Sequence, residues 1–227
     1  MKFFIQNNEL DKSVQEIRRK IRTLMNGVVA DSMKDKGIVY KKNFGVDLPH
    51  LRDLARKYPP GHDLAQRLWA LQIRETMILA TLLEPADTFA ESMAGEWMQS
   101  VNNIELVEQI CMNLFSKLSY GSQLAIRLIH VDQKWSRITG FTLSARLWKD
   151  LDNEQVRELV HLAIENADTE DFYLYRAVSL SLCRLCRRDK ATAEHIQNQT
   201  ETFVNSDKLS HRYIAGEISN EISFLNF

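Results

Sequence analysis

Apolar residues recur every three or four positions along most of the chain, with polar residues between them. The first run begins where Ser13 and Glu16 have the spacing of a helix capping box. Its apolar members are Val14, Ile17, Ile21, Leu24, Met25 and Val28. This spacing places them on one face of an α-helix. The pattern predicts an amphipathic helix that begins at Ser13 and buries an apolar stripe as far as Val28.

The same pattern continues to the end of the chain. Pro49 suits the first turn of a helix over residues 48–58, which Pro59 and Pro60 end. Further helices are predicted over residues 63–71, 74–83, 87–100, 105–118, 122–129, 136–148, 153–166, 171–187, 190–205 and 207–224. Helix pairs repeating every ~35 to 45 residues are typical of solenoids, although an irregular bundle is the alternative. We predict an all-α fold, a right-handed α-α superhelix, in a single domain over residues 1–227.

The composition supports a helical chain and indicates the cellular compartment in which we expect it. With 8 glycines and 4 prolines, the sequence has too few turn residues for a many-stranded fold. No apolar run is long enough to span a membrane, and the first residues turn polar too early for a secretory signal. We therefore expect a cytoplasmic protein with no membrane partner. The three cysteines are an odd number, so we expect reduced thiols, and we interpret Cys183 and Cys186 as core residues.

Charge is unevenly distributed along the chain, although the net charge is −1. Residues 1–60 contain 13 Lys and Arg against 7 Asp and Glu, a balance of +6, whereas residues 191–227 contain 2 against 5, a balance of −3. Such a basic segment is either an ordinary solvated surface or a rim that faces phosphates. Solenoids commonly bind an extended partner on their concave side. DNA, RNA and protein partners all fit this level of description.

The segment 43–56, with the sequence Asn-Phe-Gly-Val-Asp-Leu-Pro-His-Leu-Arg-Asp-Leu-Ala-Arg, resembles a signature of the DNA alkylation repair family. Leu68-Trp69 followed by Arg74-Glu75, and Phe172 followed by Arg176, are similar to weaker motifs of that family. The resemblance covers about residues 25–188. It implies HEAT-like helix pairs and a relationship to the alkylpurine DNA glycosylases.

Enzymes of this family excise positively charged alkylated purines, such as 3-methyladenine and 7-methylguanine, without a metal or an organic cofactor. The resemblance therefore implies N-glycosidic bond hydrolysis, with Glu108 in the place of the catalytic carboxylate. The family's tryptophan is Ile104 here, its arginine aligns with Ile138, and its second aromatic residue is Leu180. Arg137 lies one residue from the arginine position, which is a rotation of about 100° around a helix. Whether the chain is an enzyme stays open at this point.

DNA, whether duplex, damaged or branched, is the expected partner. The residues that we expect to bind it are Arg137, Arg176, Trp135, Tyr175, Arg187 and Arg188. No metal site is expected, because the histidines show neither an i,i+4 pair nor an HExxH motif. The alternatives are a catalytically inactive relative that binds DNA structures and a scaffold for a protein partner. The near-neutral charge and the acidic carboxy-terminal segment favour the scaffold.

Overall fold

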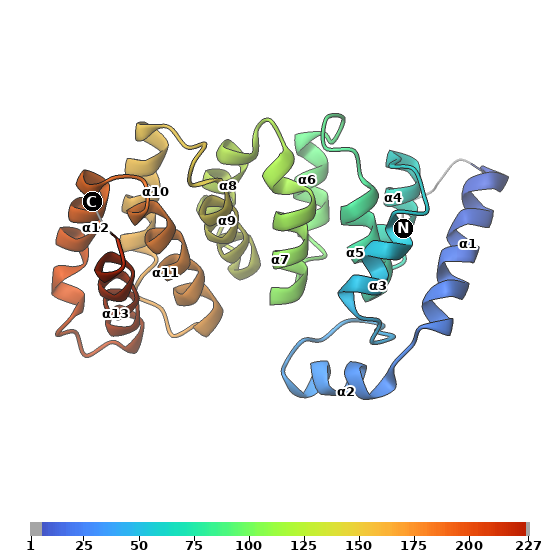
Figure 1. The fold of residues 1–227 in the computed structure, drawn as a ribbon, viewed down its shortest axis with the longest axis horizontal. Helices are drawn as coiled ribbons and strands as arrows, with labels where there is room; N and C mark the ends of the chain where they lie inside the picture. The colour runs from blue at the N-terminus through green and yellow to red at the C-terminus, as the bar shows by residue number, and fades with distance from the viewer. Residues whose placement is uncertain (1–5, 226–227) are drawn as a thin grey trace. The chain divides into compact units, whose positions relative to one another are not determined.

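The computed structural model describes residues 6–225, and the chain divides into two compact units (Figure 1). One unit ends at Leu118 and the other begins at Ser119. Within residues 6–225 there is no β-strand, and the one strand-like contact is an isolated parallel bridge between Lys42 and Ile73. The prediction of an all-helical protein is confirmed. None of the described helices is both long and apolar enough to cross a membrane.

The first unit is a double layer of helices. Its helices are α1 (Asn8–Thr23), α2 (Gly27–Asp35), α3 (Leu48–Ala55), α4 (His62–Ala70), α5 (Arg74–Leu83), α6 (Glu91–Met98) and α7 (Ile104–Asn113), followed by a 3-10 turn over Phe115–Lys117. α1 packs on α4, and Trp69 of α4 stacks on Trp97 of α6 with ring centroids 4.1 Å apart. α5 packs between α3 and α7 and on α4. These contacts form one layer of α1, α4 and α6 and a second layer of α3, α5 and α7.

The second unit repeats this arrangement. Its helices are α8 (Gly121–His130), α9 (Lys134–Leu147), α10 (Asn153–Glu165), α11 (Phe172–Cys186), α12 (Lys190–Thr200) and α13 (Leu209–Ser223), with a 3-10 turn over Glu201–Phe203. α8, α10 and α12 form one layer, and α9, α11 and α13 form the other. At Gly140 the backbones of α9 and α8 approach so closely that a Cβ atom would lie 2.6 Å from the carbonyl oxygen of Ala125. The pairs α8–α9, α10–α11 and α12–α13 are therefore stacked as solenoid repeats are.

Side-chain caps explain where several helices begin. Asp152 and Gln155 form a reciprocal capping box at the start of α10. Asp171 accepts hydrogen bonds from the backbone N–H groups of Tyr173 and Leu174, both at 3.0 Å, at the start of α11. These acceptors satisfy N–H groups that have no partner within the helix.

The first helix differs from the prediction. α1 begins at Asn8, because Asn7 caps it, and Ser13 instead donates to the carbonyl oxygen of Glu9 inside the helix. The chain turns after Thr23, and Asn26 caps a new helix, α2. The predicted buried stripe is therefore wrong beyond Ile21. Its later members Leu24, Met25 and Val28 are exposed.

Several other predicted helices are shorter in the structure, including those predicted over residues 87–100 and 105–118, which are Glu91–Met98 and Ile104–Asn113. The helix predicted over residues 48–58 ends at Ala55, well before the two prolines. The helix predicted over 190–205 ends at Thr200, where a 3-10 turn takes over, and the last helix begins at Leu209 and not at residue 207. Such differences concern helix ends, where the last turn tightens or frays.

Candidate nucleic-acid interface

A buried ion-pair network joins α5 to α7 in the first unit. Arg74 donates to the two carboxylate oxygens of Glu105 at 2.8 and 2.6 Å, and its Nη1 donates to Glu75 at 3.1 Å and to the carbonyl oxygen of Val46 at 2.7 Å. The hydroxyl of Tyr40 also donates to Glu105, at 2.8 Å. Burial by itself would lower the pKa of Arg74, but the hydrogen bonds and charge of Glu105, with the nearby Glu75 and Tyr40, more than offset this, so the pKa lies above its usual value. Arg74 therefore stays charged between two carboxylates.

The same network holds the turn that carries the family signature. Glu75 accepts the backbone N–H groups of Phe44 at 3.1 Å and Val46 at 3.3 Å. The carbonyl oxygen of Phe44 then accepts the N–H of Asn26, at 2.8 Å, at the start of α2. Gly45 has a φ of +70°, and a Cβ atom there would lie 2.0 Å from the carbonyl oxygen of Asn26. Only glycine fits, so the signature serves to dock α2.

The two carboxylates of α7 have different surroundings. The side chain of Glu105 is 13% exposed and is committed to Arg74 and Tyr40. Glu108, one turn later, is exposed on the surface of the first unit. Glu105 therefore has a structural role, whereas the side chain of Glu108 is exposed to solvent. A catalytic role for Glu108 stays a prediction.

Three positions that the family resemblance matches to site residues carry aliphatic side chains. Ile104, at the first residue of α7, is half-buried. Leu180, on α11, is 42% exposed. Ile138, on α9, is completely buried, with 0% exposure. A side chain at the position of Ile138 does not reach solvent, so a shift of register by one residue would be needed to place an arginine there on the surface.

Arg137, the neighbour of Ile138, does reach the surface of the second unit. Its side chain is 32% exposed, and Nη2 pairs with Asp132 at 2.9 Å. Nη1 lies 3.4 Å from the side-chain oxygen of Asn166, and its buried Nε has no hydrogen-bond partner in the structure. Arg137 is therefore partly neutralised but keeps unused donor capacity.

Aromatic and basic side chains meet at the amino-terminal ends of α9 and α11. The rings of Trp135 and Tyr173 have centroids 5.8 Å apart. The ammonium group of Lys134 lies 4.9 Å from the first centroid and 5.6 Å from the second, and it also pairs with Asp171 at 2.5 Å. Trp135 is thus half-buried beneath a cation that is already paired with a carboxylate.

A second aromatic group lies beside it on α11. Phe172 is 49% exposed, and its ring packs edge-on against Tyr175 with centroids 5.6 Å apart. The guanidinium of Arg176 lies over the ring of Phe172 at 5.2 Å, whereas Tyr175 is only 7% exposed and packs on Tyr213. Arg176 is therefore an exposed, oriented cation, and Tyr175 is mainly a packing residue.

Two further arginines of α11 and its end differ in how much of their charge is available. Arg187 is bidentate with Glu221, and this carboxylate raises its pKa. Arg188 donates to the carbonyl oxygens of Trp148 at 2.9 Å and Leu151 at 2.6 Å, beyond the end of α9. These bonds give both arginines a structural purpose, and their contact with DNA stays a prediction.

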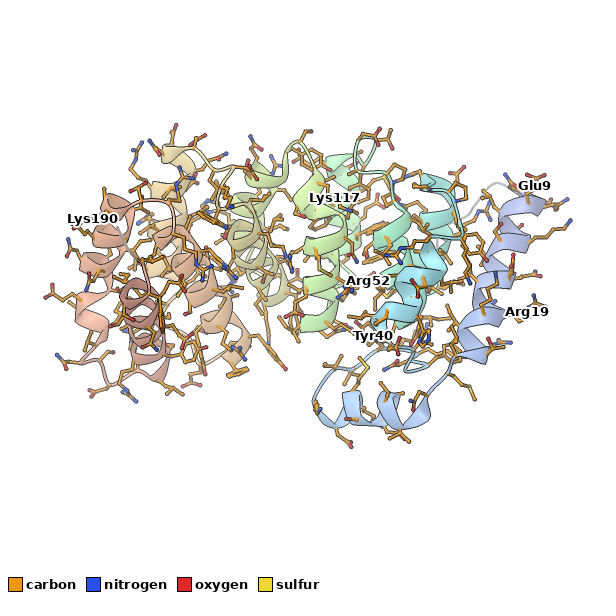
Figure 2. All side chains as sticks on the ribbon, viewed as in Figure 1. Glu9, Arg19, Tyr40, Arg52, Lys117 and Lys190 are labelled. Atoms are coloured by element: carbon orange, nitrogen blue, oxygen red, sulfur yellow. The ribbon has the colours of Figure 1, made fainter. Side chains whose placement is uncertain are left out.

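Further cations reach the surface of each unit. Arg184, which the sequence offered as a phosphate candidate together with Arg187 and Arg188, is half-buried and lies eight residues after Arg176 on α11, about 12 Å along the helix at 1.5 Å per residue. Neither guanidinium pairs with a carboxylate within residues 6–225. In the first unit, Arg19 on α1 and Arg52 on α3 are exposed (Figure 2). The basic balance of residues 1–60 was the available signal, but it did not identify individual residues.

The described residues do not bring three or more His, Cys, Asp or Glu side chains together as a metal site. The three cysteines are buried and form no disulfide bond, as predicted for core thiols. Burial raises the pKa of Cys183 to about 11 and that of Cys186 to about 12.

Comparison with known proteins agrees with this fold. A family model described as DNA alkylation repair enzyme matches residues 17–210. A solved structure, described as belonging to a new family of proteins related to the HEAT-like repeat DNA glycosylases with affinity for branched DNA structures, superposes with a TM-score of 0.77. It is 13% identical to this chain, and the match covers 92% of this chain and 93% of that one. A designed armadillo repeat protein matches with a TM-score of 0.38 at 11% identity, over 76% of this chain and 91% of its own. No curated protein matches.

The fold is therefore that of the HEAT-like helical repeat proteins. Since the family model matches most of its length, the chain belongs to the DNA alkylation repair family. The resemblance of the segment 43–56 to that family is confirmed.

Proposed function

We propose that this protein binds DNA through phosphate contacts and prefers branched or distorted DNA to a continuous duplex. The observation that carries this proposal is a set of cations that reach the surface of both units. Arg19 and Arg52 of the first unit and Arg176 of the second are exposed, and Arg184 of the second is half-buried. Phosphate contacts require positive charge and little else. Membership of the family and the branched-DNA affinity stated for the similar structure support the choice of DNA.

The aliphatic positions support binding over base excision. A glycosylase must hold the damaged nucleotide while positive charge develops on its sugar. Ile104 and Leu180 supply no aromatic surface, and the fully buried Ile138 supplies no cation. A protein that recognises the shape and charge of DNA needs none of these three groups.

Fluorescence anisotropy on a labelled duplex and on a four-way junction of the same sequence tests the proposal. We expect affinity to fall with added salt and the junction to bind more tightly. Replacing Arg176 and Arg184 by glutamine should lower the slope of log affinity against log salt by about 2, because each lost phosphate contact removes about one unit. The matched control is Arg157→Gln, an exposed arginine of α10 in the other layer of the same unit. Salt-independent binding, or an equal effect of the control, would contradict the proposal.

Base excision is the second candidate, and the exposure of Glu108 on α7 favours it. A carboxylate that solvent reaches can stabilise a cationic sugar or position water. Release of 3-methyladenine or 7-methylguanine from methylated duplex DNA is the direct assay. If release occurs and Glu108→Gln abolishes it while DNA binding persists, the protein is a glycosylase with a rebuilt site. If neither release nor DNA binding occurs, a protein-interaction scaffold replaces both proposals.

A further inference from the structure

α2 differs from every other described α-helix because it has no buried residue. It also lies across the direction of α3 and α5 (Figure 1). The turn between α1 and α2 nevertheless exposes apolar side chains. Met25 is 65% exposed, Val28 80% and Leu24 38%. We call Leu24, Met25 and Val28 the apolar corner.

The apolar corner is held firmly despite its exposure. The N–H of Asn26, between two of its members, donates to Phe44, and the side chain of Asn26 caps the helix by accepting the N–H of Val29. The backbone of α2 at Ala30 lies close to Gly45, so this side of α2 is docked on the signature turn. Val28 lies two residues before Ala30, about 200° around the helix, and so points away from the docked side. The buried Arg74 network therefore supports a rigid apolar projection.

The surroundings of the apolar corner are basic. Residues 18–42 contain 8 Lys and Arg against 2 Asp and Glu, which is a balance of +6. Arg19 and Arg22 are exposed on the last turns of α1, and the amino-terminal end of α2 adds the positive end of a helix dipole. The two acidic residues, Asp31 and Asp35, lie one and two turns after Val28. The cations thus flank the corner from the α1 side.

An apolar tip flanked by cations complements the end of a DNA helix. At a branch point the terminal base pair of an arm presents an apolar face ringed by phosphates, and proteins that open base steps insert aliphatic side chains between bases. We propose that the apolar corner packs Met25 and Val28 against the terminal base pair at a DNA branch point, while Arg19 and Arg22 contact the adjacent phosphates. This inference rests on the proposed function and assigns the preference for branched DNA to a particular surface.

The test is a Met25→Ser/Val28→Ser variant, which removes apolar surface without changing charge. Its matched control is Val204→Ser/Leu209→Ser in the second unit, where the side chains are 59% and 64% exposed. Neither variant reaches the core, and circular dichroism checks that both fold. The probe is a three-way junction with 2-aminopurine in a terminal base pair at the branch. The same fluorophore inside a continuous duplex is the reference.

We expect the wild type and the control variant to raise 2-aminopurine fluorescence at the branch, because a wedge displaces its stacking neighbour. The corner variant should lose this rise and lose roughly tenfold in affinity for the junction, since it forfeits the burial of two aliphatic side chains. Its affinity for the duplex should change less than twofold. A corner variant that keeps the fluorescence rise and the junction affinity overturns the wedge but leaves the proposed function intact.

Absence of binding to either DNA overturns both proposals. A last experiment measures binding to vesicles with a high content of anionic lipid. Sedimentation of the wild type but not the corner variant with these vesicles, together with unchanged 2-aminopurine fluorescence, would assign the corner to a lipid surface and refute the DNA wedge.

Discussion

Replacing Arg74 by methionine should destabilise the first unit more than the loss of any surface cation. Methionine keeps much of the side-chain length but removes four hydrogen bonds, two of them to Glu105, one to Glu75 and one to Val46. Glu75 is completely buried, so its charge would remain without the guanidinium. Breaking a buried ion pair in this way costs about 3 to 5 kcal/mol. Glu105→Gln, which leaves Arg74 and Glu75 paired, should cost less.

Urea unfolding followed by tryptophan fluorescence measures this loss. Trp69 and Trp97 report on the first unit, where they stack on each other. A background with Trp135→Phe and Trp148→Phe removes the signal of the second unit. With a urea dependence of about 2 kcal/mol per molar, a loss of 3 to 5 kcal/mol lowers the midpoint by roughly 1.5 to 2.5 M.

Arg52→Met is the control for this measurement, because Arg52 is an exposed arginine on α3 of the same unit. Its effect should stay within about 0.5 kcal/mol. Equal midpoints for the Arg74 and Arg52 variants would refute the view that the network holds the signature turn in place. A midpoint lowered as much by Glu105→Gln as by Arg74→Met would show that the cost comes from Glu105 alone.

Three further predictions concern the backbone, a helix cap and the thiols. Gly45→Ala should expose the amides of α2 to hydrogen exchange, because its Cβ clashes with Asn26, whereas Gly37→Ala, with a φ of +78° and no atom within 4 Å, should cost only about 1 to 2 kcal/mol of strain. Asp189 caps α12, and a backbone hydrogen bond from Thr192 lowers its pKa. Asp189→Ala should therefore lower the free energy of unfolding by about 1 kcal/mol at neutral pH, and this difference should vanish as the pH falls through the lowered pKa. Since burial raises the pKa of Cys183 to about 11, native Cys183 should react with iodoacetamide at pH 8 at least tenfold more slowly than in unfolded protein, and equal rates would contradict its burial.

The helical periodicity predicted the fold class because long apolar stripes at three- and four-residue spacing can be buried only by packing helices against one another. It failed where one stripe spans two helices. The spacing from Val14 to Val28 is continuous, so the sequence pattern does not reveal that Asn26 starts a new helix. Asn26 followed by Gly27 is the sequence feature that favours a new helix, because Asn26 is a suitable cap residue. This feature takes effect in the structure because the N–H of Asn26 is bonded to the carbonyl oxygen of Phe44.

The candidate site was predicted less completely, because the spacing of residues along the chain does not show which side chains are exposed or which charges are paired. Glu105 and Glu108 share one helix face, yet Glu105 is paired with Arg74, which lies 31 residues earlier in the chain. Arg188 reads as a surface cation but donates to two carbonyl groups 37 and 40 residues away. The Arg-Glu motif at residues 74 and 75 was recognised by resemblance, and its physical role emerged only from its contacts with the turn.

The network around Arg74 also sets an order of events during synthesis. Contacts between consecutive helices, such as α4 with α5 and α8 with α9, can form as each pair leaves the ribosome. The bond from Tyr40 to Glu105 spans 65 residues, so this part of the network cannot form until α7 has emerged. Until then Arg74 lacks its bidentate partner and is paired with Glu75 alone. The first unit should therefore complete its folding late, as one cooperative event, and a ribosome stalled before residue 105 should carry a nascent chain that proteases still cut between α2 and α3.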